Sequence, residues 1–264
     1  MQSLTYSSNR LFLSVCRQVK SGDWSHVLAG SGLVESCYIS NRTSEIATIL
    51  PLWSLSDDKP VLNLNPKFLA ALATALGVPA EPEQHDLPQG VTPEDVLAYL
   101  YAVLHAPSYR ARYAEFLKSD FPRLPLGTAD GSPFAAVWQA LLPLGHELIA
   151  LHLLRRVPAD LRASFPISGD NTVDKPRFEL PAGHSVGRVW INATQYFDGV
   201  AEATWQHRIG GYQVCEKWLK DRKGRTLGLD DIEHYADVVA VLTRTRVLQN
   251  DIDVIAKGRL WTGE

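Results

Sequence analysis

The spacing of apolar residues along the chain changes from a strand-like pattern to a helical one and back again. Short apolar or β-branched runs come first, separated by polar turns, at Leu11–Val15, Trp24–Leu28, Cys37–Ile39 and Ile46–Trp53. Runs of this length bounded by turn residues are typical of strands. The pattern predicts three or four short strands joined as a meander.

From Asn65 onward the apolar residues follow the spacing of a helix. This residue can cap a helix, a proline follows it, and Gly77 lies where the apolar spacing ends. Thr92 repeats the start signal, with a proline next and acidic residues in the first turn. These local signals predict two helices, at 65–77 and 92–105.

Two more helices are expected before residue 155. The segment 108–118 has its apolar residues on one helical face, so Arg110 and Arg112 on the opposite side are expected to be solvated. A long apolar helix is expected at 133–154, where an internal proline and a glycine predict a kink.

Strand-like alternation returns between Val186 and Phe197, and it predicts a strand pair or one bent strand. Asp198-Gly199 is expected to form a turn after it. Helices are then expected at 201–207, at 214–220 after a break at Gly210-Gly211, and from Asp230 almost to the end of the chain.

Together these patterns predict an α+β fold. Short antiparallel strands are expected at the start and again after residue 170, with a helical subdomain between them and a long C-terminal helix. The chain is therefore expected to have three parts: a β-rich part at 1–62, a helical part at 63–165, and a part at 166–264 that holds strands, a basic glycine-containing motif and the C-terminal helices. The third part is expected to pack with the first.

Composition narrows the class of protein. Hydrophobic residues make up 45% and charged residues 21% of the 264, an ordinary globular mixture. Three widely spaced cysteines without a zinc-site pattern fit a reducing compartment. Residues 1–10 lack a signal-peptide pattern, and no apolar run approaches the ~20 residues of a membrane helix. A soluble, cytoplasmic protein without a membrane partner is expected.

Positive charge is concentrated between Arg208 and Arg225. This stretch holds six basic residues and two acidic ones, a surplus of four, whereas the whole chain has a formal charge of −3 and the remainder therefore sums to −7. Tyr212 and Trp218 lie among these charges. Such a composition is typical of a surface that meets a phosphate backbone, and equally of a solvated helix face.

The common catalytic motifs are missing from the sequence. It has no GxxxxGK[ST], GxGxxG or GxSxG motif and no [DN]PP[YF] tetrapeptide, so nucleotide hydrolysis and methyl transfer lack their residues. His146 and His152 are six residues apart and point to different sides of a helix, which excludes a shared metal ion. Asp221-Arg222-Lys223, with Asp198 as a distant acid, is only a weak match to a nuclease motif because it follows a helix.

Several longer motifs resemble the C-terminal specificity (target recognition) domain of single-polypeptide type I (type ISP) restriction-modification enzymes and related fused restriction enzyme-methyltransferases. Their joint order, from about Asn9 to about Asp253, is more specific than any one of them. The motifs lie at Glu45–Trp53, Tyr99–Leu126, Leu144–Leu154, Asn192–Val200, Ile209–Arg225 and Asp230–Tyr235.

The resemblance implies recognition of double-stranded DNA, with adenine methylation and cleavage carried out by other domains. No catalytic residue, metal or cofactor is then expected in this chain; S-adenosylmethionine, ATP and Mg are expected only in the other domains. The expected partners are double-stranded DNA and the methyltransferase, motor and nuclease domains of one longer polypeptide, of which this chain would be the C-terminal part.

Binding of this kind divides into phosphate contacts, which set the register, and base contacts, which specify sequence. Motifs shared by enzymes of different specificity cannot encode that specificity, so base contacts are expected in the loops between the motifs. The phosphate candidates are Lys217, Lys220, Arg222, Lys223 and Arg225, with Gly210 and Gly211 allowing close backbone approach. The base or loop candidates are Arg42, Lys175, Arg177, Arg188 and Tyr212.

Two alternatives stay open at this point. The apolar helices between residues 64 and 154 also suit a coupling module that docks on the methyltransferase and contacts DNA little. A standalone metal nuclease using Asp221 is the third hypothesis. Trp218 is expected to pack a short helix onto the core rather than to contact DNA.

Overall fold

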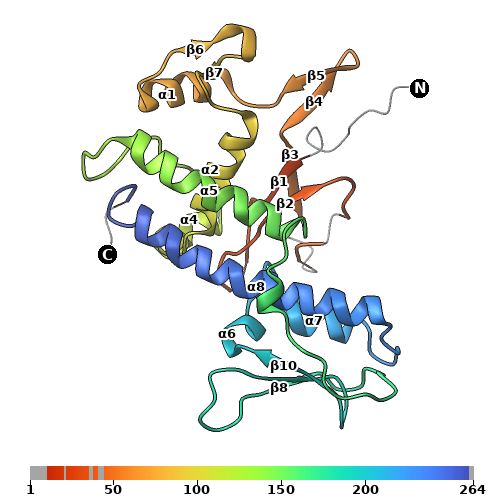
Figure 1. Ribbon diagram of the computed structural model, residues 1–264. Helices are drawn as coiled ribbons and strands as arrows, with labels where there is room; N and C mark the ends of the chain where they lie inside the picture. Colours follow the sequence, from red (N-terminus) through yellow and green to blue (C-terminus); the bar gives the residue numbers. More distant parts are fainter. Residues whose placement is uncertain (1–10, 21, 36–37, 41–44, 262–264) are drawn as a thin grey trace. The chain divides into compact units, whose positions relative to one another are not determined.

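A computed structural model describes the fold of residues 11–20, 22–35, 38–40 and 45–261. Its contacts divide the chain into two compact units, Met1–Leu153 with Leu248–Glu264, and Leu154–Val247. Both units combine helices with short antiparallel strands (Figure 1), and a long helix closes the described chain. The α+β class predicted from the sequence is confirmed. The three-part division into 1–62, 63–165 and 166–264 stays a prediction.

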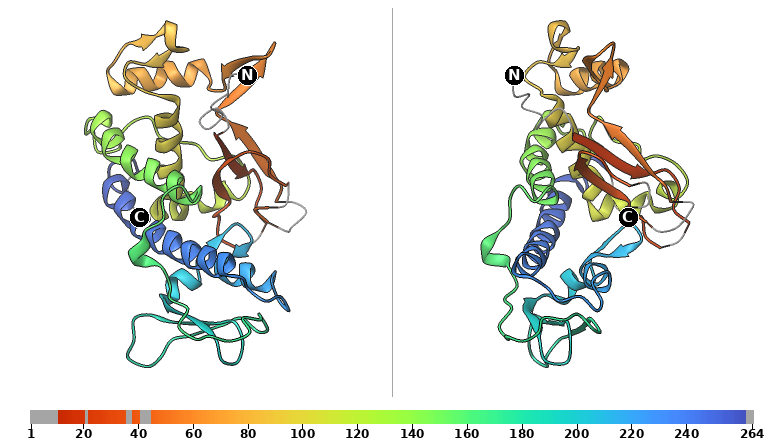
Figure 2. Two further views of the ribbon diagram at one scale, coloured as in Figure 1. Left: turned by 45° about the vertical axis from the view of Figure 1, so that its right-hand side comes forward. Right: turned by 90° about the vertical axis from the view of Figure 1, so that its right-hand side faces the viewer.

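The first unit begins with a three-stranded antiparallel sheet, seen in red and orange in Figure 2. Its strands are β1 (Leu11–Cys16), β2 (Val27–Ser31) and β3 (Ala47–Pro51), in the order β2-β1-β3. The meander expected from the sequence is therefore wrong, because β3 pairs with β1 and not with β2. Every residue of β1 is buried, as expected for an apolar strand at the centre of a sheet.

A two-stranded hairpin follows the sheet. It consists of β4 (Trp53–Ser56) and β5 (Lys59–Leu62), and its turn residues Asp57 and Asp58 have φ values of 49° and 60°. Two central residues with positive φ match the twist of a hairpin. A second small hairpin, β6 (Ala80–Glu81) and β7 (Leu87–Pro88), surrounds the short 3₁₀ helix η1 (Pro82–Gln84).

The first two helices begin and end where the sequence predicts. In α1 (Pro66–Leu76), the Asn65 side chain accepts a hydrogen bond from the Lys67 amide at 2.9 Å, and Gly77 closes the helix with φ of 71°. In α2 (Pro93–His105), Thr92 and Asp95 bond reciprocally as a capping box. Caps involve residues within four positions of each other, which is why the sequence alone reveals them.

The next helical segment differs from the expectation. It breaks at Tyr113 into α3 (Pro107–Arg112) and α4 (Ala114–Leu117). Arg110 is not solvated: its Nε donates to the Leu104 carbonyl at 2.6 Å, and burial lowers its pKa to about 10. The solvated position predicted for Arg110 is thus wrong, because the guanidinium closes the C-terminal end of α2.

Helix α5 (Phe134–His152) packs on α2 in the core of the first unit. A Cβ at Gly145 would lie 2.0 Å from the backbone oxygen of Ala98, so glycine is required where the two helices cross. By length and composition α5 could cross a membrane, which corrects the expectation that no apolar run is that long. Leu141, Leu148 and Leu151 are fully buried within the unit, as in the core helix of a globular domain.

The second unit is built on the antiparallel sheet β10-β9-β8, with β8 (Arg177–Glu179), β9 (Gly187–Trp190) and β10 (Tyr196–Val200). The strand pair predicted at 186–197 is confirmed. The predicted turn at Asp198-Gly199 is wrong, because β10 continues to Val200 through a bulge at Gly199, whose φ is 86°. The 3₁₀ helix η2 (Ala159–Leu161) precedes the sheet.

Helices cover one face of this sheet. The core gathers Val189 and Phe197 from the sheet, Leu219 from α7 (Val214–Lys220) and Tyr235 from α8 (Leu229–Ala256). Helix α6 (Glu202–Trp205) adds Trp205. The predicted helices at 201–207 and 214–220 and the long last helix are confirmed, with shorter bounds for the first.

Candidate nucleic-acid interface

The basic stretch begins with a minimal hairpin, β11 (Arg208–Ile209) and β12 (Tyr212–Gln213). Gly210 and Gly211 form its turn, and Gly210 has φ of 55°, a value that glycine adopts without steric cost. The break predicted at this pair is therefore the tip of a hairpin. It leads directly into α7, whose Cys215 and Leu219 point into the core.

Ion pairs within α7 hold two of its lysines. Lys217 pairs with Asp221, and its Nζ also lies 5.0 Å from the centre of the Tyr212 ring. Lys220 Nζ lies 3.0 Å from a carboxylate oxygen of Glu216. Exposed pairs of this i, i+4 kind contribute only about 0.3–0.5 kcal/mol, so both ammonium groups can be redirected to a phosphate at low cost.

The turn after α7 carries charge without such partners. Lys223 and Arg225 are both exposed, and neither has an acidic partner among the residues that the structure describes. Gly224 between them has φ of 79° and donates from its amide to the Val173 carbonyl at 2.7 Å. Together with Lys220, these two side chains form what we call the basic turn: Lys220, Lys223 and Arg225.

Arg222 differs from the other basic residues because it is held by the fold. Its guanidinium lies 3.6 Å from the centre of the Trp218 ring, Nη1 donates to the Trp218 carbonyl at 3.1 Å, and Nε lies 3.4 Å from Asp231 at the start of α8. Trp218 in turn packs on Tyr235, with ring centroids 5.2 Å apart, so its predicted core role is confirmed. Arg222 thus joins α7 to α8.

We expect Arg222→Ala to lower the free energy of unfolding by about 1–2 kcal/mol, because it removes a stacked, partly buried cation and its hydrogen bonds. Arg225→Ala is the matched control, since it removes an exposed arginine without such contacts. Urea denaturation of both variants checks this. Equal stability of the two variants would show that the Trp218 contact contributes nothing.

Two base candidates, Arg177 and Arg188, lie on the sheet of the second unit. The register places Arg177 opposite Trp190, and Trp190 opposite Tyr196. The next row on the same face holds Glu179, Arg188 and Asp198. Successive residues of a strand face opposite sides, so these six side chains share the face turned away from the core.

The guanidinium groups on this face are stacked and paired. Arg177 lies 4.6 Å from the Trp190 ring centre, and Arg188 lies 4.7 Å from that of Tyr196. Sequence reasoning did not include the two aromatic residues among the interface candidates, and it considered Asp198 only as a turn residue and a distant nuclease acid. The period of two in R-V-W and Y-F-D was the available signal, because it puts Arg188 with Trp190 and Tyr196 with Asp198 on one face.

The remaining base candidates are spread out. Lys175 is exposed just before β8, and Tyr212 is half-buried in the β11–β12 hairpin. Arg42 lies outside the described residues. Its neighbours Ser40 and Glu45 are described and buried, and the Ser40 hydroxyl donates to the Glu45 carboxylate at 2.6 Å.

Glu45 is the centre of a buried polar network in the first unit. The backbone amide of Lys20 donates to it at 3.2 Å, and His26 Nε2 lies 3.2 Å from its other oxygen. Burial would raise the pKa of the Glu45 carboxyl, but the hydrogen bonds from Ser40 and Lys20 and the neighbouring His26 hold it below its ordinary value. The network joins the start of the unit to the segment that precedes β3.

The motif at Asn192–Gln195 has a structural role. Gln195 is fully buried, and its amide donates to the Ile167 carbonyl at 3.0 Å and to Asn171 Oδ1 at 2.7 Å. Its Oε1 accepts from the Asn171 amide at 2.9 Å and from Asn192 Nδ2 at 3.0 Å. The motif therefore ties the segment around Asn171 to the β9–β10 turn.

The acidic and histidine candidates do not converge. Asp198 pairs with Arg188 at 3.4 Å, and Asp221 pairs with Lys217. His146 bonds to Asp95 at 2.7 Å. Among the described residues, no group of three His, Cys, Asp or Glu side chains is placed to hold a metal ion.

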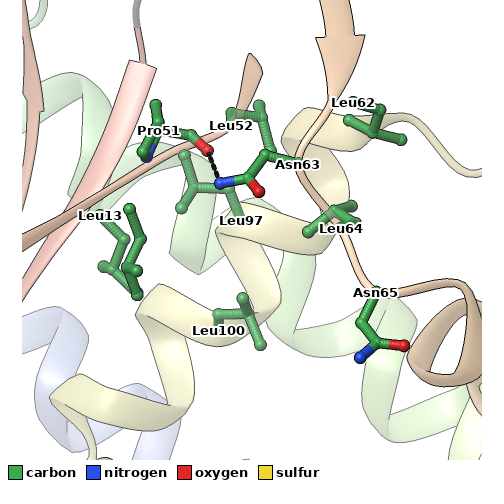
Figure 3. A pocket seen from close by; sticks show the side chains of 10 residues that line it. Leu13, Pro51, Leu52, Leu62, Asn63, Leu64, Asn65, Leu97 and Leu100 are labelled. Carbon is green, nitrogen blue, oxygen red and sulfur yellow. Dashed lines mark hydrogen bonds between the residues drawn. The ribbon is translucent and has the colours of Figure 1, made fainter. Parts of the chain in front are cut away.

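The first unit also contains an apolar pocket of about 400 Å³ (Figure 3). It lies where β1, β3 and α2 meet the segment before α1, and Asn63 Nδ2 donates there to the Pro51 carbonyl at 2.8 Å. None of its lining side chains is titratable, so it offers no acid–base chemistry. The residues that line it are Leu13, Leu50, Pro51, Leu52, Leu62, Asn63, Leu64, Asn65, Leu97 and Leu100.

Three solved structures have a similar fold. A cryoEM structure of a DrdV–DNA complex matches with a TM-score of 0.64 and 19% identity, over 96% of this chain and 25% of that chain. The ATP-dependent Type ISP restriction-modification enzyme LlaBIII bound to DNA matches with a TM-score of 0.64 and 16% identity, over 98% and 16% of the two chains. A nuclease-deletion mutant of the Type ISP restriction-modification enzyme LlaGI, in complex with a DNA substrate mimic, matches with a TM-score of 0.59 and 19% identity, over 98% of this chain and 22% of that chain.

This chain therefore spans a quarter or less of the proteins whose structures it resembles. No curated protein matches it. A family model described as the Type ISP C-terminal specificity domain matches residues 1–250. The match confirms the resemblance inferred from the motifs and, with it, the expected role in DNA recognition within a restriction-modification enzyme. The chain belongs to the family of Type ISP C-terminal specificity domains.

Proposed function

We propose that this chain recognises a specific sequence in double-stranded DNA and directs adenine methylation and cleavage by other domains of a longer cytoplasmic polypeptide. The family match over residues 1–250 carries this proposal. The methyltransferase, motor and nuclease domains, with S-adenosylmethionine, ATP and Mg, would lie outside this chain. Its own task would be binding and not chemistry.

Phosphate contact is assigned to the basic turn. Lys220, Lys223 and Arg225 are exposed at one end of α7, which supports their contact with a phosphate backbone. Gly210 and Gly211 remain candidates for close backbone approach. Lys217 is already shared between Asp221 and Tyr212, and Arg222 is held against Trp218, so we assign both a smaller share of the binding.

Replacing Lys220, Lys223 and Arg225 together with alanine should weaken binding to every duplex. Each phosphate contact releases about one counterion, so the slope of log affinity against log salt should flatten by about three. At physiological salt the loss is on the order of 100-fold. Fluorescence anisotropy with labelled duplexes at several salt concentrations measures both quantities.

The control variant removes three other exposed lysines, Lys59, Lys67 and Lys257, from the first unit. It has the same net charge as the basic-turn variant, and its binding and salt slope should remain close to those of the unchanged protein. Equal losses of DNA affinity in the two variants would show that the loss comes from the change in net charge and not from the basic turn.

A docking role toward the rest of the polypeptide is the second candidate function. It is favoured by apolar side chains that are exposed on β3 and on the β4–β5 hairpin, namely Ile49, Leu50, Leu55 and Val61. This role and DNA binding are compatible. If the basic-turn variant bound DNA normally, docking would become the better account of the domain.

A further inference from the structure

The outward face of the sheet β10-β9-β8 is a surface whose side chains are positioned by the fold, and we call it the arginine face. It consists of Arg177, Glu179, Arg188, Trp190, Tyr196 and Asp198. The opposite face of the same strands carries Phe178, Val189 and Phe197 toward the core. The position of the six side chains is therefore fixed by the packing of the second unit and not by a loose loop.

Its charge differs from that of the basic turn. Two arginines stand beside two carboxylates, so the face is neutral overall, whereas the basic turn carries three positive charges of which only Lys220 has a described acidic partner, Glu216. A phosphate backbone would be repelled by Glu179 and Asp198. The edge of a base pair instead presents donors and acceptors side by side, which suits a surface that offers both.

The guanidinium groups are held in defined orientations. Each guanidinium carbon lies over an aromatic ring, and one nitrogen of each group is paired: Arg188 Nε lies 3.4 Å from Asp198, and Arg177 Nη1 lies 3.5 Å from Glu179. Pairing at Nε leaves Arg188 the two Nη groups, and pairing at Nη1 leaves Arg177 the Nε and Nη2 groups. Each arginine thus retains a pair of donors for a bidentate contact.

Exposure and an unsatisfied donor support contact with a ligand. The Arg177 and Arg188 side chains are 51% and 39% exposed. Trp190 Nε1 on the same face is buried and has no hydrogen-bond partner among the described residues. Buried donors without partners are rare in folded proteins, so this face holds a polar group that the fold itself does not satisfy.

We infer that the arginine face reads base edges in the major groove, with Arg177 and Arg188 each recognising O6 and N7 of a guanine. Trp190, Tyr196, Glu179 and Asp198 act as positioning residues that orient the two guanidinium groups. This inference rests on the proposed DNA recognition and adds which surface distinguishes sequences.

The test uses the complete polypeptide that carries this chain and a library of duplexes with randomised sequence. Arg188→Lys and Arg177→Lys retain the charge but lose the planar pair of donors. Each should reduce the preference for guanine at one base pair by roughly 5- to 150-fold, with an unchanged salt slope. Arg156→Lys is the matched control on an exposed arginine outside the face, and it should alter neither quantity.

The positioning role needs its own readout. Tyr196→Leu removes the ring under Arg188 and should relax the preference at the same base pair as Arg188→Lys, whereas Tyr196→Phe retains the ring and should restore it. Asp198→Asn should relax the same position. Thermal unfolding of each variant separates this local effect from a loss of folding.

Three results are distinguishable. Unchanged guanine preference in both arginine variants would overturn the inference. Equal weakening on all duplexes by Arg188→Gln, with a salt slope lower by about one, would also overturn it and make the arginine a phosphate contact. If the unchanged protein showed no preference within the library, the proposed function itself would fail, whatever the variants do.

Discussion

Replacing Gly145 with alanine is expected to lower the free energy of unfolding by about 3 kcal/mol or more. The added Cβ would stand 2.0 Å from the backbone oxygen of Ala98 and 2.6 Å from its carbonyl carbon. A flexible side chain could move aside, but the contacted atoms are backbone atoms of α2. The helices α2 and α5 would have to separate, and the core of the first unit would lose its packing density.

Gly127→Ala is the control for this prediction. Nothing lies within 4 Å of a Cβ built at Gly127, and its φ is not positive, so the change should stay within about 0.5 kcal/mol. Chemical denaturation of the two variants, compared at equal m values, measures the difference. If Gly145→Ala were as stable as Gly127→Ala, the close crossing of α2 and α5 would be disproved.

Replacing Gln195 with alanine is the second change with a large expected effect, about 2–4 kcal/mol. The buried amide makes four hydrogen bonds, so its loss removes the bond partner of the Ile167 carbonyl, of the Asn171 amide and of Asn171 Oδ1. Gly169 is packed against the same side chain, with an ideal Cβ only 2.6 Å from Gln195 Cδ. A cavity would therefore open beneath this segment.

Thr194→Ala provides the comparison, because this neighbour is exposed and, within the described part of the chain, its side chain bonds only to Asn192 Oδ1. Amide hydrogen exchange at Asn171 and Thr172 should accelerate in Gln195→Ala and remain slow in Thr194→Ala. Unchanged exchange in Gln195→Ala would show that the segment is held by other contacts.

The hydrogen bonds of Gln195 support the expectation that the Asn192–Val200 motif is structural and does not itself read a DNA sequence. Its polar groups are used within the domain, where they hold the β9–β10 turn and the preceding segment together. Arg222 is a similar case within the basic stretch, because its stacking on Trp218 uses the cation for packing. We accordingly assign sequence reading to the arginine face and phosphate contact to the basic turn.

Local features of the fold could be predicted from the sequence because the interacting residues are close along the chain. The caps at Asn65 and Thr92, the end of α1 at Gly77 and the strand pair around β9 and β10 all depend on such neighbours. The family could also be inferred, since it rests on the order of motifs and needs no coordinates. The charge surplus of the basic stretch is likewise a property of the sequence.

Only the tertiary structure decided how distant segments meet. The pairing of β3 with β1, the burial of Arg110 against α2, and the continuation of β10 through Asp198 depend on contacts that no local pattern encodes. The same holds for function, because Arg177 and Arg188 are single charges in the sequence and become a stacked, neutral face only when three strands align. Charge and periodicity are local quantities, whereas register and burial are set by the free energy of the whole fold.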